Sequence, residues 1–160
     1  MISDTKFVYG AEKLGKRIAT IRAKASIPVL TAEIGELLLQ RTLRRFDRQV
    51  DPDERKWKPI SEAGVSSKRR AGFDGKPLLR RTGQMRSAIK LIRGGIGSTF
   101  TNTGAGVRIG IDDPKIAERA RAHNQGQGNM PVRRFLGIGS LDIKAVDSLL
   151  RRKAKELEQL

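Results

Sequence analysis

Residues 28–49 read PVLTAEIGELLLQRTLRRFDRQ and form the strongest helical pattern in the chain. Their apolar side chains recur at helical spacing and fall on one face: Leu30, Ile34, Leu37, Leu38 and Phe46. Neither Gly nor Pro interrupts the segment between residues 36 and 50, so the helix would extend for about 30 Å. Pro28, two residues after Ser26, suits the start of a helix, and the sequence Asp-Pro-Asp at 51–53 ends it.

Shorter elements flank this helix on both sides. On its N-terminal side the pattern predicts a short strand at residues 6–8 and a second amphipathic helix at residues 11–25. On its C-terminal side, residues 51–77 are typical of a flexible loop, and the run 66–70 within it is either a short helical turn or disordered. Residues 78–92 then predict a helical turn or a short helix that passes into a strand.

The second half of the chain carries the β pattern. Apolar and other residues alternate over 107–111, and a Gly-rich turn at 102–106 precedes them, so we expect this strand to pair with residues 92–100 as a hairpin. Further elements are predicted at residues 114–124 (helix), 130–139 (strand) and 141–160 (helix). The prediction is an α+β fold, with N-terminal helices and a C-terminal helix packed on a small, mostly antiparallel sheet, in one domain over residues 1–160.

Composition indicates a modest core and a strongly basic surface. Hydrophobic residues make up 38% of the 160 residues and aromatic residues only 4%, so partner subunits would have room to add stability. The net charge is +16, and residues 41–93 hold 16 basic against 6 acidic side chains. From charge alone, a nucleic-acid contact surface and a surface that pairs with acidic proteins are equally good interpretations.

No pattern in the sequence predicts catalysis, a cofactor or a metal ion. The chain has no Cys and one histidine, His123, so a zinc site of the usual kind cannot be completed. Asp112 and Asp113 precede Pro114 and suit the start of a helix, while the glycines at 104–106 lack the Lys-Ser/Thr of a phosphate-binding loop. The N-terminus lacks the apolar region of a signal peptide, and no apolar run approaches membrane-spanning length. We therefore expect a soluble, non-enzymatic protein made in a cytoplasm.

Four segments together resemble the phage virion morphogenesis family, the tail-completion proteins of Mu-like and related contractile-tailed phages. Residues 44–60 are similar to the helix end, Pro-Asp-Gly turn and Trp-x-Pro-Leu element of that family. Residues 78–89 follow its pattern of Leu, then Thr-Gly, then Leu-Arg and a closing Ser-x-Ile. Residues 123–126 resemble its His-Gln-Phe-Gly stretch, and residues 130–138 resemble its Ile-Pro-Ala-Arg-Pro-Phe-Leu-Gly. This sequence departs at Glu54 in place of the turn Gly, at Arg134 in place of Pro, and in the histidine segment.

The resemblance implies a structural assembly protein that completes or terminates the tail and forms part of the tail–neck interface. It implies a homo-oligomeric ring, with a hexamer matching the symmetry of the tail, located in the virion after assembly in the host cytoplasm. The partners would be the tail tube, the terminator or sheath, and neck or connector proteins, with DNA in the lumen as a further contact and no membrane. The alternative is a basic protein that binds DNA without sequence preference.

Basic and aromatic side chains are the interface candidates. Arginines beside apolar residues favour ordered contacts, because the planar guanidinium pairs with carboxylates through two hydrogen bonds. For Trp57 and Phe135, packing in the core of the chain itself is the competing interpretation. The predicted contact residues are Arg41, Arg44, Arg45, Trp57, Arg69, Arg70, Arg80, Arg81, Arg133, Arg134 and Phe135.

Overall fold

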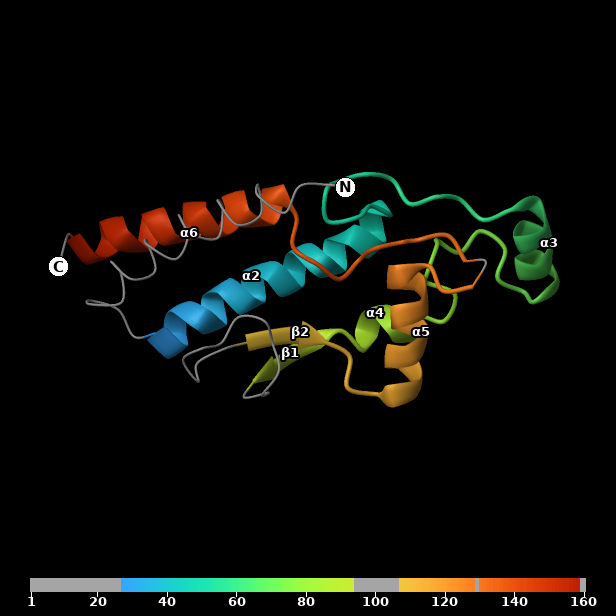
Figure 1. Ribbon diagram of the computed structural model, residues 1–160, viewed down its shortest axis with the longest axis horizontal. Coiled ribbons are helices and arrows are strands. Elements are labelled where there is room, and N and C mark those ends of the chain that lie inside the picture. The colour runs from blue at the N-terminus through green and yellow to red at the C-terminus, as the bar shows by residue number, and fades with distance from the viewer. Residues whose placement is uncertain (1–26, 94–106, 129, 159–160) are drawn as a thin grey trace.

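The structure, a computed structural model, describes residues 27–93, 107–128 and 130–158 (Figure 1). The strand expected at residues 6–8, the helix expected at 11–25 and the turn expected at 102–106 lie outside the described residues. So does the part of the first hairpin strand that follows residue 93.

The described residues form an α+β fold, as predicted. A two-stranded antiparallel sheet lies among helices, with α2 central in the molecule (Figure 1). Helix α6 lies beside α2 on one side, the sheet contacts α2 on the other, and α4 packs on α5. The elements in chain order are α2 (Ile27–Arg48), α3 (Glu62–Arg70), α4 (Gln84–Ser87), β1 (Lys90–Arg93), β2 (Val107–Gly110), α5 (Pro114–Gln125) and α6 (Ser140–Glu158).

Helix α2 has the bounds that its sequence predicts to within one residue. The helix ends where Gln49 adopts a left-handed conformation with φ of 55°. Asp51 then stabilises the turn, because its Oδ1 accepts hydrogen bonds from the backbone N of Asp53 (2.8 Å) and of Arg55 (2.9 Å). Glu54 occupies the turn position at which the Pro-Asp-Gly pattern has Gly. Its φ is 65°, so the turn forms although this backbone conformation favours glycine.

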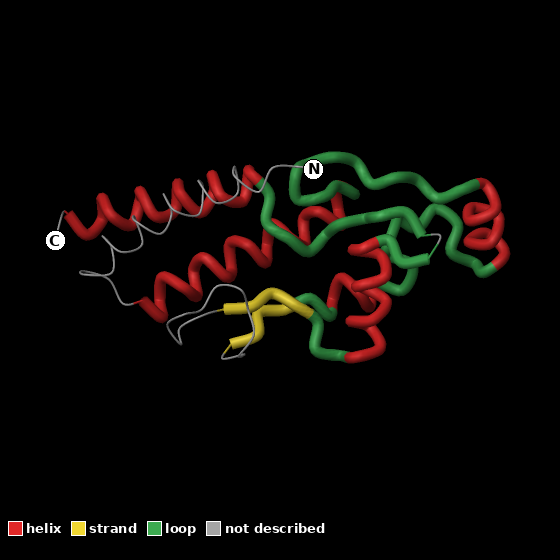
Figure 2. Tube along the Cα trace, in the orientation of Figure 1, coloured by secondary structure: helices red, strands yellow, loops and turns green. Residues whose placement is uncertain are grey.

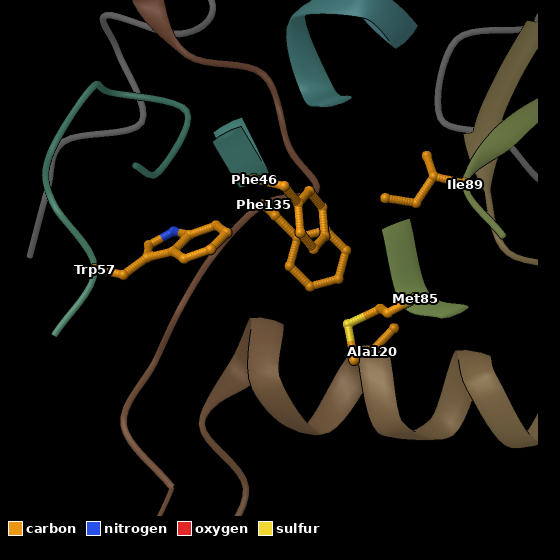
Figure 3. Close-up of a cluster of buried hydrophobic side chains, with 6 residues drawn as sticks. All are labelled: Phe46, Trp57, Met85, Ile89, Ala120 and Phe135. Carbon is orange, nitrogen blue, oxygen red and sulfur yellow. The ribbon is translucent and has the colours of Figure 1, made fainter. Parts of the chain in front are cut away.

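Two hydrophobic clusters lie at the two ends of α2. Near its start, Leu30 packs with Val146 and Leu150 of α6, which confirms the apolar faces predicted for both helices. Near its end, a second cluster joins α2, α4, α5 and the loops, and its members are Phe46, Trp57, Met85, Ile89, Ala120 and Phe135 (Figure 3). The centre of the Phe46 ring lies 4.9 Å from that of Phe135, with the two rings tilted by 56°. It lies 5.6 Å from the centre of the Trp57 ring, in the edge-to-face contact that aromatic pairs favour.

The sheet confirms part of the predicted hairpin. β1 pairs with β2 in antiparallel register, with Lys90 opposite Gly110 and Arg93 opposite Val107. The first strand therefore begins at Lys90, two residues before the predicted start. The predicted short helix before β1 is α4. Its first residue follows Gly83, and Gly83 has a left-handed backbone conformation.

The prediction of a strand at residues 130–139 is wrong. This segment has no strand partner among the described residues, and side chains and a turn satisfy its backbone instead. Asn124 Oδ1 accepts from the backbone N of Phe135 and of Leu136 at 2.9 Å, and the backbone N of Arg133 donates to the His123 carbonyl at 2.8 Å. An apolar and basic sequence with a proline fits such an extended segment as well as it fits a strand.

Residues 51–77, predicted as a loop, contain a helix. Helix α3 begins after Ser61, whose side chain accepts a hydrogen bond from the backbone N of Gly64 (3.3 Å), so it starts before the turn expected at residues 66–70. None of its residues is buried, and it lies at the end of the molecule between two long loops (Figure 2). Its sequence lacks the apolar stripe by which a helix is recognised, and only the cap signals it.

Candidate functional site

Burial divides the predicted contact residues into two groups. Four side chains lie inside the packing of the chain itself: Arg45, Trp57, Arg133 and Phe135. Seven are exposed or half-buried: Arg41, Arg44, Arg69, Arg70, Arg80, Arg81 and Arg134. The buried four stabilise the fold of one chain, so a surface that meets other proteins would be built from the other seven. Contact of any of them with another protein stays a prediction.

A buried carboxylate fixes the position of the basic half of α2. Asp142, in the first turn of α6, is 0% exposed and pairs with the guanidinium groups of Arg41 and Arg45. Its Oδ2 also accepts a hydrogen bond from the backbone N of Gly139 (2.8 Å). Because a buried charge is stable only when it is paired and hydrogen-bonded, this carboxylate ties α2 to the start of α6.

Arg45 extends the same network into the segment before α6. Its Nη1 donates to the carbonyl oxygens of Phe135 (2.8 Å) and Gly137 (2.9 Å). Burial lowers the pKa of the Arg45 guanidinium, and the neighbouring charge of Asp142 acts in the opposite direction and raises it. The position of Gly139 is equally constrained, since a Cβ there would lie 2.0 Å from the Pro52 carbonyl oxygen.

The sequence did not single out Asp142 or Gly139 as important residues. An acidic residue in the first turn of a helix is common, because it complements the positive end of the helix dipole. The carboxylate lies about a hundred residues from its guanidinium partners in the sequence. A local sequence pattern does not link residues that are so far apart, so only the folded structure reveals the network.

Trp57 and Arg133 form hydrogen bonds that connect two of the four segments that resemble the family. The Trp57 Nε1 donates to the Arg134 carbonyl oxygen at 2.9 Å. In return, Arg133 donates from Nε to the Lys58 carbonyl oxygen (2.9 Å) and from Nη2 to that of Pro59 (3.2 Å). The first and the fourth segment, 44–60 and 130–138, therefore form one structural unit.

Several exposed or half-buried arginines are paired within the chain. Asp47 accepts from Arg80 Nη1 at 2.9 Å and from Arg86 Nη2 at 3.2 Å, and Arg69 lies 3.5 Å from Asp74. Exposed pairs of this kind contribute roughly 0.2–1 kcal/mol each, so they exchange readily for a carboxylate of another protein.

Other arginines have no carboxylate partner in the described part of the chain. Arg44, Arg70 and Arg134 are exposed and make no ion pair with any described residue. The Arg81 guanidinium lies 4.8 Å from the centre of the Phe73 ring, which orients it without neutralising its charge. These side chains are free to meet an acidic surface.

A pocket of about 320 Å³ opens between α3, α4 and α5. Its size is at the lower end of ligand clefts, which span roughly 300–1,000 Å³. All four segments of the resemblance contribute to it: Ile60 from the first, Leu78 to Met85 from the second, His123 from the third and Arg133 from the fourth. Its apolar wall is formed by Ile60, Pro77, Leu78, Leu79 and Met85, and its basic groups are Lys68, Arg81, Arg119, His123 and Arg133.

The pocket holds a buried guanidinium and a half-buried imidazole that have no acidic partner among the described residues. Arg133 is 4% exposed and donates only to carbonyl oxygens, and burial lowers the pKa of its guanidinium. The His123 Nδ1 is buried and has no hydrogen-bond partner among the described residues. Burial lowers the pKa of His123, and the charges of Arg133 and Arg119 lower it further. No Asp or Glu is among the residues that line the pocket.

The described residues contain no group of three or more His, Asp and Glu side chains that could hold a metal ion. Over the same ranges, none of the helices combines the length and the apolar character needed to cross a bilayer.

Comparison with known proteins agrees with the four-segment resemblance. The sequence profile of the phage virion morphogenesis family matches residues 11–155. The Mu-like prophage FluMu G protein 1 of Haemophilus influenzae is 29% identical over 131 residues, which cover 81% of each chain. No solved structure matches the chain.

Proposed function

The chain belongs to the phage virion morphogenesis family, and we propose that within this structural role it completes the tail and forms part of the interface between tail and head. The observation that carries the proposal is a scaffold held by buried ion pairs and aromatic packing, which presents arginines that make no ion pair with described residues. The Asp142 network and the aromatic cluster fix α2, α6 and the segment 130–138, while Arg44, Arg70 and Arg134 remain exposed and unpaired with described residues.

Assembly through a ring fits this distribution of charge. In a ring, each copy repeats the same basic surface, so weak contacts act together and bind more strongly than one copy alone. We propose a homo-oligomeric ring, with a hexamer as the expected stoichiometry, whose partners are acidic faces of tail tube, terminator or sheath, and neck or connector proteins. Native mass spectrometry, followed by imaging of any closed assembly, measures the number of copies.

The test of the surface removes three of these arginines together. The variant Arg44→Ala, Arg70→Ala, Arg134→Ala lowers the net charge by three and leaves the buried network in place. The matched control Lys115→Ala, Arg121→Ala, Arg152→Ala removes the same charge at exposed positions outside the candidate set. Each is supplied to a phage that lacks the gene, and infectious particles are counted. We expect loss of particles with the first variant only; equal yields from both would contradict the proposed surface.

A second function, binding of DNA without sequence preference, is favoured by the net charge of +16. It predicts that the purified chain binds duplex DNA with an affinity that falls steeply as salt rises, because each phosphate contact releases a counterion. It also predicts that the two triple variants weaken DNA binding to a similar extent, since both remove three positive charges. A gel-shift series over salt concentration therefore separates the two functions.

A further inference from the structure

We propose that the pocket between α3, α4 and α5 binds a short peptide segment of a neighbouring virion protein, one that carries a carboxylate next to an apolar side chain. The proposal rests on the proposed function for the identity of the neighbour as a virion protein. The chemistry of the segment is inferred from the pocket itself.

The first argument is the buried positive charge. Arg133 lies 4% exposed at the pocket, and its hydrogen bonds go to the neutral carbonyl oxygens of Lys58 and Pro59. Buried charges in proteins are normally paired, because desolvation of an unpaired charge is unfavourable. The described part of the chain supplies no carboxylate to Arg133, so a bound carboxylate would complete the pairing.

The second argument is the other groups that line the pocket. Arg119 makes no ion pair with any described residue, and Arg81 is engaged only with the Phe73 ring. The buried Nδ1 of His123 has no hydrogen-bond partner there. A carboxylate that enters the pocket would thus meet the guanidinium groups of Arg81 and Arg119 as well as Arg133, which is the arrangement of a recognition site for an anion.

The apolar wall selects the class of partner. Leu78, Leu79 and Met85 line the same pocket as the basic side chains of Arg119 and Arg133. A peptide offers both an apolar side chain and a carboxylate within a few ångströms. A duplex DNA backbone offers phosphates on a convex surface, and such a surface does not reach a guanidinium that is 4% exposed. The mixture of apolar wall and buried cation therefore favours a peptide.

The test uses the single histidine as a reporter. The imidazole Cε1 proton of His123 gives one signal in the NMR spectrum of the full chain. The probe is the synthetic peptide acetyl-Leu-Asp-Leu-Glu-Leu-amide, and its control is acetyl-Leu-Asn-Leu-Gln-Leu-amide, which has the same shape and no charge. We expect a saturable change of the His123 signal with the acidic peptide and none with its amide counterpart.

Two matched variants locate the binding. Arg119→Gln removes a cation that lines the pocket, and Arg121→Gln removes one from the same helix that does not line it. We expect Arg119→Gln to lower the affinity for the acidic peptide by about five- to tenfold, as for the loss of one charge pair in a partly desolvated site. We expect Arg121→Gln to change the affinity by less than about twofold. Because Arg119 is exposed, its replacement leaves the fold intact.

Each remaining result overturns the proposal. It fails if the acidic peptide gives no saturable change, if the amide peptide binds equally well, or if both variants weaken binding alike. Displacement of the peptide by an equimolar amount of a short duplex DNA would instead identify a nucleic-acid site. Since the purified chain is measured, a failure here leaves the count of infectious particles in the assembly test unaffected, and the two proposals are judged separately.

Discussion

Replacement of Asp142 by Asn tests the buried network on which the scaffold depends. The substitution keeps the shape of the side chain but removes its charge, so the guanidinium of Arg45, 4% exposed, loses its counterion. Removal of one partner of a buried ion pair costs about 3–5 kcal/mol. Here the value should lie in the upper half of that range, because Oδ1 of Asp142 also pairs with Arg41 and Oδ2 also accepts from the backbone N of Gly139, whereas Asn offers one acceptor oxygen in place of two.

The assay is chemical unfolding followed by the fluorescence of Trp57, the only tryptophan in the chain and a member of the core cluster. For a domain with a total stability of about 5–15 kcal/mol, such a loss moves the midpoint of unfolding far toward lower denaturant concentration. The control is Asp74→Asn, whose exposed pair with Arg69 is worth at most about 1 kcal/mol.

A double-mutant cycle separates the charge from the packing. In Arg45→Met, Asp142→Leu both partners become apolar, so neither half of this buried pair stays charged, and Arg41, whose side chain is 24% exposed, keeps its contact with solvent. We expect the double variant to be more stable than the sum of the two single losses predicts, by about 1–3 kcal/mol. A loss under about 1 kcal/mol for Asp142→Asn, or simple additivity in the cycle, would show that the buried pair does not hold α2 to α6.

Three further changes have expected outcomes that the same unfolding assay measures. Gly139→Ala should cost more than about 2 kcal/mol, because the new Cβ would meet the Pro52 carbonyl oxygen at 2.0 Å; an unchanged midpoint would contradict this packing. Trp57→Phe should cost about 1–3 kcal/mol, since the Arg134 carbonyl oxygen loses its donor, and circular dichroism replaces fluorescence as the probe. The pKa of His123 is lowered in the fold, so the unfolded chain takes up a proton first as the pH falls below about 6.5, and stability should decline there. His123→Asn should have a smaller decline over that window, and equal pH profiles would rule out His123 as its source.

Helical periodicity carried most of the successful part of the sequence prediction. The apolar face of α2 and that of α6 are readable because each helix buries one stripe against its neighbour, as Leu30 does against Val146 and Leu150. The alternation at Val107 to Gly110 identified a strand for the same physical reason, a half-buried surface with period two.

Side-chain hydrogen bonds explain where the prediction went wrong. Residues 130–139 are extended, but Asn124, Trp57 and Arg45 satisfy their backbone in place of a neighbouring strand. Helix α3 has no buried residue and therefore no apolar stripe to detect. Both features depend on residues far away in the sequence or on a single cap, which a local pattern does not encode.

The candidate residues could be found from the sequence by type but not by role. Arg45 and Arg134 each follow another arginine in the sequence and lie beside apolar residues. Arg45 is nevertheless buried and paired with Asp142, whereas Arg134 is exposed. The pocket is a further example, because its lining comes from segments between Ile60 and Arg133 that only the fold brings together.

The central claim, that this chain serves as a structural part at the junction of tail and head, is tested most directly by particles made without it. The gene is disrupted in the phage or prophage that carries it, and the products of a lytic cycle are imaged by electron microscopy and counted. We expect filled heads and separate or aberrant tails, with joined particles restored when the intact gene is supplied. Normal numbers of tails joined to heads in the absence of the protein would contradict it.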